Sequence, residues 1–432
     1  MMSQEGSSPT LIRQCGLFSK ALALAGLLGA CDPGLAPGTI GHVQGFAGVV
    51  ASDEPQSVLV ARDILSAGGT AADAAVAMYF TMSVTLPSRV GIAGNGACIV
   101  HNPKTKTTEA IIFIPPSPAA VAAPRALFAL HAKYGRLRWA ALISPAEGMA
   151  RFGTPVSRAL AQDLVLTGNS LHNDPATRAI FTKADGSLVG EGDAVQNIDL
   201  ASFLSRLRAR GPADLYAGTL AREMSEAVQA GGGKLSIDEL RAVSVPIIAT
   251  EKVKLGNLTA HFPPTPAGVE EARLLRGLAE KKAMSTSPSS EAATGGGFVV
   301  ADRDGQGVAC QTSLGDLFGS RKLIPGMGML LAQGTVSPSS LGPMLVVAHN
   351  VHEFRYAVTS AGGEGGLAGL AGVASKSVID ERPLVEAVKA EAGRRMVAIG
   401  CPKGLPPHPD SCQVAVDPEG FGYGMGVGTK DK

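Results

Sequence analysis

Six cysteines and a pair of closely spaced histidines are the first residues in this chain whose types could do chemistry. His349 and His352 lie three positions apart, a spacing that would put both on one helical face and suit a metal ion. Their surroundings, VVAHNVHEF, are typical of a strand and a turn, so we interpret them as surface histidines. The cysteines show no metal-site spacing. The sequence therefore predicts no metal centre, and we find no motif for a cofactor.

Cys31 lies at the end of a leader that is typical of exported proteins. It follows Leu28-Gly29-Ala30, and a leader with Arg13, Lys20 and the apolar run ALALAGLLGA precedes it. This pattern resembles a bacterial lipobox, in which the leader is removed just before the cysteine and the thiol carries the lipid. The alternative is an ordinary signal peptide with a chance cysteine. We expect lipidation at Cys31, export, and a place in the bacterial cell envelope, anchored to a membrane and facing the periplasm.

Export would expose the remaining cysteines to an oxidising compartment, where disulfides form. Cys15 would leave with the leader. Cys401 and Cys412 could close a proline-rich loop, but sequence does not show the geometry that a disulfide needs, so this pairing stays open.

Composition excludes one large class of partner. The chain has 432 residues, of which 45% are hydrophobic and 4% aromatic, and its net charge is +1. Without a long run of like charge or a supply of aromatic rings, it has little with which to follow phosphates or stack bases. We therefore expect no nucleic-acid partner. A small-molecule or peptide substrate remains, while any protein partner is unknown.

Periodicity predicts the elements that must position a site. Apolar residues recur with helical spacing, or a capping box precedes them, at 56–68, 71–82, 156–166, 217–229 and after Ser236. Strand patterns occur at 97–101, at 298–301 and 308–312 on either side of a turn, and at 344–348 and 354–359. Helices on either side of a hairpin sheet indicate a layered α+β fold. The segment 274–293 begins helical and becomes a polar loop, which we take as a boundary.

A series of motifs, in this order and spacing, resembles the γ-glutamyltransferases. They are Gly48–Ser52, Asp63–Leu65, Ala72–Ala77, the glycine-rich Gly91–Ala97, Tyr216–Gly218, Gly231–Gly233, Phe298–Gly305, Ser339-Ser340, Ser360–Gly363 and Asp417-Pro418. The resemblance implies a four-layer αββα N-terminal-nucleophile hydrolase fold. In that family a precursor cuts itself, and the new N-terminal threonine attacks a γ-glutamyl amide such as glutathione, with its own α-amine as base.

Carried onto this chain, the resemblance places the nucleophile three residues before Phe298, which is Gly295. A shift of one residue makes Thr294 the nucleophile, and glycines beside it permit the strained turn that self-cleavage requires. The alternative is a loop threonine before a flexible glycine run.

The resemblance also implies supporting residues. Gly362 and Gly363 would stabilise the oxyanion, Thr312 would support the nucleophile, and Ser339 and Ser340 would bind substrate. Each has a plainer interpretation as a turn or packing residue.

Two differences from the family's pattern affect the residues that would recognise the substrate. Ile114 stands where the family has the arginine that pairs with the substrate carboxylate, and the acidic residue for the substrate amine is absent before Ser339. The helical region before Phe298 is also short, so we expect a shallow cleft and altered substrate recognition.

We therefore predict a lipoprotein signal peptide at 1–30, a linker at 31–47, a large-subunit-like part at 48–293 and a small-subunit-like part at 294–432. The first functional hypothesis is an envelope amidohydrolase or acyltransferase that acts through a self-released Thr294. The second is a catalytically inactive binding or scaffold protein. Self-cleavage before Thr294 separates the two.

Overall fold

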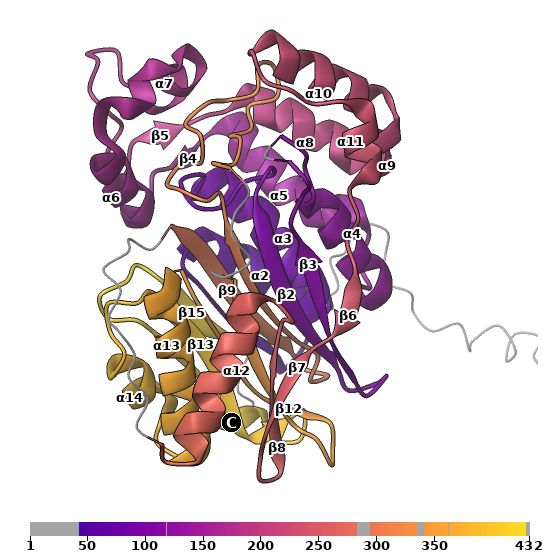
Figure 1. Ribbon diagram of the computed structural model, residues 1–432, viewed down its shortest axis with the longest axis vertical. Helices are drawn as coiled ribbons and strands as arrows, with labels where there is room; N and C mark the ends of the chain where they lie inside the picture. The colour runs from indigo at the N-terminus through magenta and orange to yellow at the C-terminus, as the bar shows by residue number, and fades with distance from the viewer. Residues whose placement is uncertain (1–42, 118, 283–293, 335–340, 362, 429–432) are drawn as a thin grey trace, which may run out of the picture. The chain divides into compact units, whose positions relative to one another are not determined.

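Two antiparallel β-sheets lie face to face, and helices cover the outer face of each (Figure 1). The computed structural model describes residues 43–117, 119–282, 294–334, 341–361 and 363–428. Apolar side chains fill the space between the sheets and the space beneath each helical layer. The order of layers is helix, sheet, sheet, helix, which confirms the predicted α+β, four-layer αββα architecture.

The first sheet has seven strands in the order β15-β1-β9-β10-β2-β3-β6. Their bounds are β1 (Phe46–Ser52), β2 (Asn95–Asn102), β3 (Thr107–Phe113), β6 (Ile247–Ala249), β9 (Gly295–Asp302), β10 (Gly307–Ser313) and β15 (Tyr423–Gly428). Side chains alternate between faces, so Phe298 points to the helices while Val299 points to the second sheet.

The second sheet has six strands in the order β14-β13-β12-β11-β8-β7. Their bounds are β7 (Glu251–Leu255), β8 (Leu258–Phe262), β11 (Met344–Ala348), β12 (Glu353–Ser360), β13 (Met396–Leu405) and β14 (Gln413–Val416). A further pair, β4 (Thr154–Pro155) and β5 (Ala194–Val195), joins two loops among the helices.

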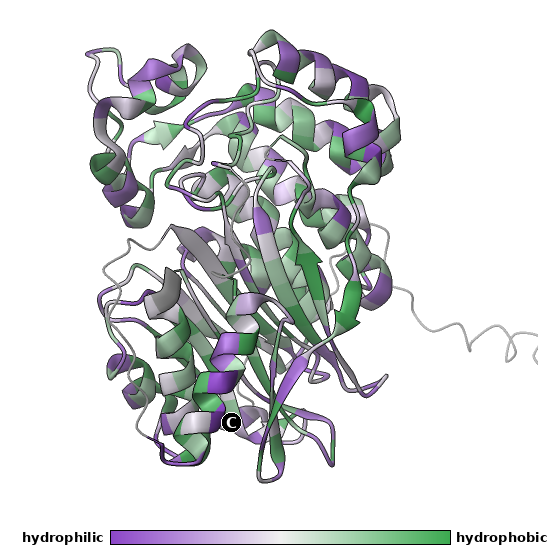
Figure 2. Cartoon of the chain, viewed as in Figure 1, coloured by the Kyte–Doolittle hydropathy of each residue, from purple (hydrophilic) through white to green (hydrophobic). Residues whose placement is uncertain are grey.

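The helical layer over the first sheet is the larger one. It contains α2 (Pro55–Ser66), α3 (Ala71–Thr85), α4 (Ala123–Tyr134), α5 (Trp139–Phe152), α6 (Arg158–Thr167), α7 (Pro175–Phe181), α8 (Ile198–Arg210), α9 (Ala213–Ala217), α10 (Thr219–Ala230) and α11 (Ile237–Ala242). Every residue of α3 is buried, and Thr70 and Asp73 form the capping box that starts it. The outlying α10 shows both purple and green residues in Figure 2, as an amphipathic surface helix should.

The helices on the second sheet are α12 (Pro266–Ala279), α13 (Gly363–Ala374) and α14 (Leu384–Lys389). Short turns of other helix types span Gly168–Asn173, Ser375–Ile379 and Pro409–Ser411. The predicted boundary segment 274–293 is thus the last part of α12 followed by residues 283–293, which lie outside the described ranges.

The predicted large- and small-subunit-like parts both contribute strands to each sheet, and in the first sheet their strands alternate in blocks. In the first sheet β9 lies between β1 and β10, so a strand after Thr294 is paired on one side with a strand from the N-terminal part. In the second sheet β11 is likewise paired with β8. A cut before Thr294 would therefore leave both parts held together by sheet hydrogen bonds and by shared cores.

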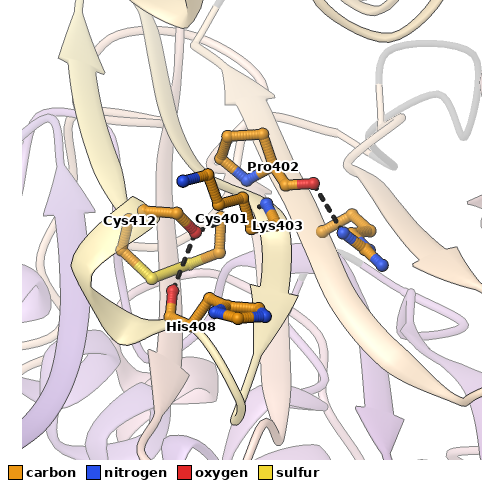
Figure 3. Close-up of a disulfide and its surroundings, with 7 residues drawn as sticks. Cys401, Pro402, Lys403, His408 and Cys412 are labelled. Atoms are coloured by element: carbon orange, nitrogen blue, oxygen red, sulfur yellow. Dashed lines mark hydrogen bonds between the residues drawn. A yellow bond between two sulfur atoms is a disulfide. The ribbon is translucent and has the colours of Figure 1, made fainter.

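The described residues contain one disulfide between two strands of the first sheet and one between β13 and Cys412, directly before β14. The open pairing of Cys401 with Cys412 is present, and Figure 3 shows it closing the loop at the end of β13. Cys98 and Cys310, for which the sequence suggested no partner, are also bonded to each other. They lie directly opposite in the antiparallel pair of β2 and β10, a register that spacing alone does not reveal.

Glu271 on α12 is an unusual member of the second helical layer. It is fully buried, and neither carboxyl oxygen has a hydrogen-bond partner among the described residues. Gly342 lies against it, since a Cβ added there would meet a carboxyl oxygen at 2.6 Å. Burial without a partner raises the pKa of Glu271 well above its ordinary value, because the protein interior disfavours the charged carboxylate.

We expect this carboxyl to make the protein less stable as pH rises. Above its ordinary pKa the unfolded chain loses the proton while the folded chain keeps it, so stability falls until the pH passes the raised folded pKa. Glu271→Gln should remove this contribution. Between about pH 5 and about pH 8, the fall in urea-unfolding free energy should therefore be smaller in Glu271→Gln than in the parent protein.

The neighbouring Glu270 provides a matched control, because it lies on the same helix and pairs with Arg273 near the surface. Glu270→Gln should leave the pH dependence nearly as it is in the parent protein. An unchanged slope in Glu271→Gln would contradict the prediction.

Candidate functional site

Thr294 lies directly before the first residue of β9 and is half-buried. The three glycines after it belong to the strand and are buried, so they are not a flexible run. Each is a glycine because of close packing. A Cβ on Gly295 would meet the Thr312 carbonyl oxygen at 2.7 Å, and a Cβ on Gly297 would meet the Thr359 methyl at 2.5 Å. A nucleophilic side chain does not fit at position 295, whereas Thr294 carries one at the end of the strand.

The first residues of β9 extend beyond β1, whose pairing with β9 ends at Ser52 and Phe298. Their backbone groups on that side need other partners, because buried N–H and C=O groups are costly when unpaired. Gly297 N–H donates to the Asp53 carboxylate at 2.7 Å, and its carbonyl accepts from Asp53 N–H at 3.1 Å. Gly295 N–H donates to the Ala361 carbonyl at 2.9 Å.

The Gly295 carbonyl is bound by Arg89, whose Nη1 donates to it at 3.2 Å. The guanidinium is buried and forms a bidentate pair with Asp163, with its Nε and Nη2 at 2.7 and 2.6 Å from the two carboxylate oxygens. Ser88 donates to the same carboxylate at 2.7 Å. Planar pairing of this kind fixes a side chain in position, so the backbone directly after Thr294 is held rigidly.

Asp53 adds a titratable group to this frame. Burial raises the pKa of Asp53 to about 7, and the hydrogen bond from Gly297 and the charges of Arg89 and Arg395 limit the rise. The strand geometry near Thr294 is therefore coupled to a carboxyl that titrates near neutral pH.

The other predicted catalytic residues lie partly in this region. Thr312 is opposite Gly296 on β10, and its Oγ1 donates to the Asn95 carbonyl at 2.8 Å, so its hydroxyl proton is already engaged. Gly363 begins α13, two residues after the Ala361 carbonyl that binds Gly295. The first N–H groups of a helix have no partner within the helix, which makes this end suitable for a developing negative charge.

Several predicted residues lie outside the described ranges. These are Gly362, the substrate-binding pair Ser339 and Ser340, and the lipidation site Cys31. Their roles stay predictions, as do those of Thr294, Thr312 and Gly363.

The histidines that could have formed a metal site lie in the turn between β11 and β12. His349 Nδ1 is 3.2 Å from the Thr259 hydroxyl, and the His352 carbonyl is 2.9 Å from His101 Nε2. Within the described ranges, no cluster of three or more His, Cys, Asp or Glu is arranged to hold a metal ion.

Neither of two cavities in the described part of the protein is lined by Thr294. One of about 30 Å³, lined by Val90, Gly91 and Met329 among others, is large enough for about one water. A surface pocket of about 460 Å³ lies on the second sheet near Tyr356 and Lys403 and does not include Thr294. In the ranges that the structure describes, we also find no helix with the length and apolar character needed to span a membrane.

Sequence reasoning missed Arg89, Asp163, Asp53 and Asn95, whose neighbours in space come from distant parts of the chain. One signal was available for Arg89. It is a charged residue just before the glycine-rich turn and next to the apolar Val90, and an arginine in such a place needs a buried partner. The sequence did not say which acid that partner is.

Comparisons with known proteins agree with this architecture. The family model for gamma-glutamyltranspeptidase matches residues 57–124 and 117–294, which is more than half of the chain. The chain is 30% identical over 260 residues to glutathione hydrolase 3 of Arabidopsis thaliana, covering 55% of this chain and 41% of that protein. It is 31% identical over 228 residues to the glutathione hydrolase proenzyme of Escherichia coli, covering 46% of this chain and 39% of that one. The chain thus spans about two fifths of the length of these relatives.

A solved structure extends the likeness over nearly the whole fold. The cephalosporin acylase from Bacillus halodurans superposes with a TM-score of 0.71 at 17% identity, over 91% of this chain and 99% of that one. At this identity the likeness concerns the fold alone, and it confirms the N-terminal-nucleophile hydrolase architecture. Because the family model matches more than half of the chain, from residue 57 to residue 294, the chain belongs to the γ-glutamyltranspeptidase family.

Proposed function

We propose that this protein is an amide hydrolase or acyltransferase whose nucleophile is Thr294, released as a new N-terminus by self-cleavage. The observation that carries the proposal is the placement of Thr294. It stands directly before the first residue of a central strand, and three partners hold the two glycines that flank Gly296: Ala361 directly after β12, Arg89 between α3 and β2, and Asp53 directly after β1. A rigid backbone beside a half-buried hydroxyl is what a nucleophile and its attack geometry require.

The proposed chemistry has two stages. In the first, the Thr294 hydroxyl attacks the carbonyl of Ala293, and the peptide bond becomes an ester as its nitrogen becomes the free α-amine of Thr294. Water then hydrolyses the ester, which frees the Thr294 hydroxyl and leaves a carboxylate on Ala293. In the second, that amine takes the hydroxyl proton as Thr294 attacks a substrate amide. The amine leaving group departs with a proton, and water or an acceptor amine then releases the acyl group.

The proposed substrate is a γ-glutamyl or related amide, in line with the printed names of the relatives, with an altered recognition of the glutamyl end. Ile114 lies directly after β3 and has no charge to offer a carboxylate. Arg89, the buried arginine nearest to the strand, is engaged by Asp163 and by the Gly295 carbonyl. A zwitterionic amino-acid head would lack its usual ion pair at this end, which favours a substrate with an uncharged acyl end.

We further propose that the protein is exported and attached to a membrane through lipid on Cys31. Besides the leader sequence, the two disulfides support this proposal, because such bonds persist in oxidising compartments outside the cytosol.

Intact-mass measurement of the protein purified from membranes tests both proposals together. We expect two polypeptides with a break between Ala293 and Thr294, and an acyl-glyceryl mass on a fragment that begins at Cys31. Release of p-nitroaniline from acyl anilides should accompany the processed form. A single intact chain without turnover would contradict the enzymatic proposal, and an unmodified Cys31 would contradict the anchor.

A further inference from the structure

The side chain of Asn95 is a buried amide without a partner. It is 1% exposed, and neither its oxygen nor its nitrogen has a hydrogen-bond partner among the described residues. Buried polar side chains are normally paired, and an unpaired amide in a protein interior is unfavourable. The backbone carbonyl of the same residue does have a partner, the Thr312 hydroxyl. The orphaned group is therefore the side chain alone.

Asn95 lies at the same end of the first sheet as Thr294. It is the first residue of β2 and is opposite Ser313 on β10, which in turn is opposite Gly295 on β9. Two strand spacings separate Asn95 from Gly295, which places them about 10 Å apart. The three positions form a row across the end of the sheet, one residue from the proposed nucleophile.

The row faces the space between the two sheets. In β2, Ile99 belongs to the core between the sheets and Cys98 to the core beneath the helices. Asn95 is four residues before Ile99, so it lies on the same face as Ile99, toward the second sheet. In β9, a Cβ on Gly297 would point at Thr359 of the second sheet. Gly295 is two residues before Gly297 and therefore lies on the same face. The Asn95 amide and the approach to Thr294 are therefore on one face.

A neighbour on that face shows what a structural amide does here. Gln311 lies two residues before Ser313 on β10, and its Oε1 accepts from Gly342 N–H at 2.7 Å. It thereby joins the first sheet to the segment before β11. Asn95 makes no such link within the described residues, so both of its amide atoms keep their hydrogen-bonding capacity for a molecule that reaches this end of the sheet.

We propose that the Asn95 side chain binds the far end of the substrate's acyl group and selects one that ends in a carboxamide or a peptide unit. An asparagine amide offers an acceptor oxygen and a donor nitrogen, which complement a group with one donor and one acceptor. A carboxylate would oppose the Asn95 oxygen, and an alkyl end would leave both atoms unpaired. A linear acyl chain about as long as two extended residues spans the distance together with one hydrogen bond. This inference rests on the proposed function of Thr294 and names the substrate class for that site.

Three p-nitroanilides test the selection. Each has the same six-carbon acyl chain, which ends in a carboxamide, a carboxylate or a methyl group. With the processed protein, kcat/KM for the carboxamide should exceed the other two by at least about tenfold, because a polar site rejects groups that leave it unpaired. Asn95→Ala should bring the three values to within about threefold of one another. Asn102→Ala, at the other end of β2, should keep the parent preference.

A second variant separates recognition from structure. Asn95→Leu replaces the unpaired amide by an apolar side chain of similar size, so we expect a higher Tm together with loss of the carboxamide preference. A structural role for the amide would instead lower the Tm.

Binding is measured separately from turnover, so that the two proposals fail in different ways. Calorimetric titration with hexanediamide should show an affinity at least about tenfold above that for hexanedioate, and Asn95→Ala should abolish the difference. Equal affinities, or a preference that survives in Asn95→Ala, would overturn the role of Asn95. Selective binding without any turnover would uphold this role and contradict the proposed catalysis by Thr294.

Discussion

Thr294→Ala is expected to yield one uncut polypeptide where the parent protein yields two, and to lower amide hydrolysis by more than about a thousandfold. The alanine removes the hydroxyl that attacks the carbonyl of Ala293, so neither the self-cleavage nor the substrate reaction has a nucleophile. A denaturing gel and intact-mass measurement give the first result, and release of p-nitroaniline gives the second.

Two further variants show whether the hydroxyl itself is responsible. Thr294→Ser keeps a hydroxyl at the end of β9 and should retain measurable cleavage. Thr105→Ala, which removes an exposed hydroxyl in the turn between β2 and β3, should be cut as in the parent protein. Cleavage before residue 294 in the alanine variant would exclude Thr294 as the nucleophile, provided that circular dichroism shows all of these proteins to be folded.

Arg89→Met is expected to lower the free energy of unfolding by about 3–5 kcal/mol, because it removes the bidentate partner of the fully buried Asp163 carboxylate and leaves only Arg395, at 3.9 Å, beside it. The same change removes the donor to the Gly295 carbonyl, so cleavage before Thr294 should also slow. Urea unfolding and the time course of processing after synthesis measure the two effects.

Arg62 provides the matched control. It pairs with Asp63 at 2.8 Å, but both side chains are largely solvated, at 43% and 67% exposure. Arg62→Met should therefore change stability by less than about 1 kcal/mol. If the two arginines gave equal losses, the buried pair would not have the importance that its geometry indicates.

The double variant Arg89→Met with Asp163→Leu distinguishes stability from positioning. A buried ion pair replaced as a whole by apolar side chains often keeps its stability, so unfolding should recover most of the loss. Processing should remain slow, because methionine does not bind the Gly295 carbonyl. Full recovery of processing would show that Arg89 acts on Thr294 only through the stability of the fold.

Local sequence patterns predicted most of the helices and strands near the site. The hairpin around 302–305 is present as β9 and β10, and the apolar segment that begins at Ala71 is the fully buried α3. These predictions succeed because they depend on periodicity and on capping side chains within a few residues of each other. The starts of some elements shifted, as with α12, which begins at Pro266.

The glycines after Thr294 show where local patterns stop being sufficient. In sequence, a run of glycines is equally compatible with a flexible loop and with a strand. Packing decides between the two, since the carbonyl of Thr312 and the methyl of Thr359 leave no room for a side chain at positions 295 and 297. Those contacts join residues of β9 to β10 and β12.

The sequence by itself determined the family, the layered α+β architecture and the position of a threonine before a run of glycines. These follow from residue types and short spacings that lie along the chain. Only the tertiary structure decided what surrounds that threonine. The bond between Cys98 and Cys310, the pairing of Arg89 with Asp163, and the unpartnered amide of Asn95 each depend on strand register or on helix packing. Such contacts join residues far apart in the chain, and no local pattern encodes which of the available partners will meet.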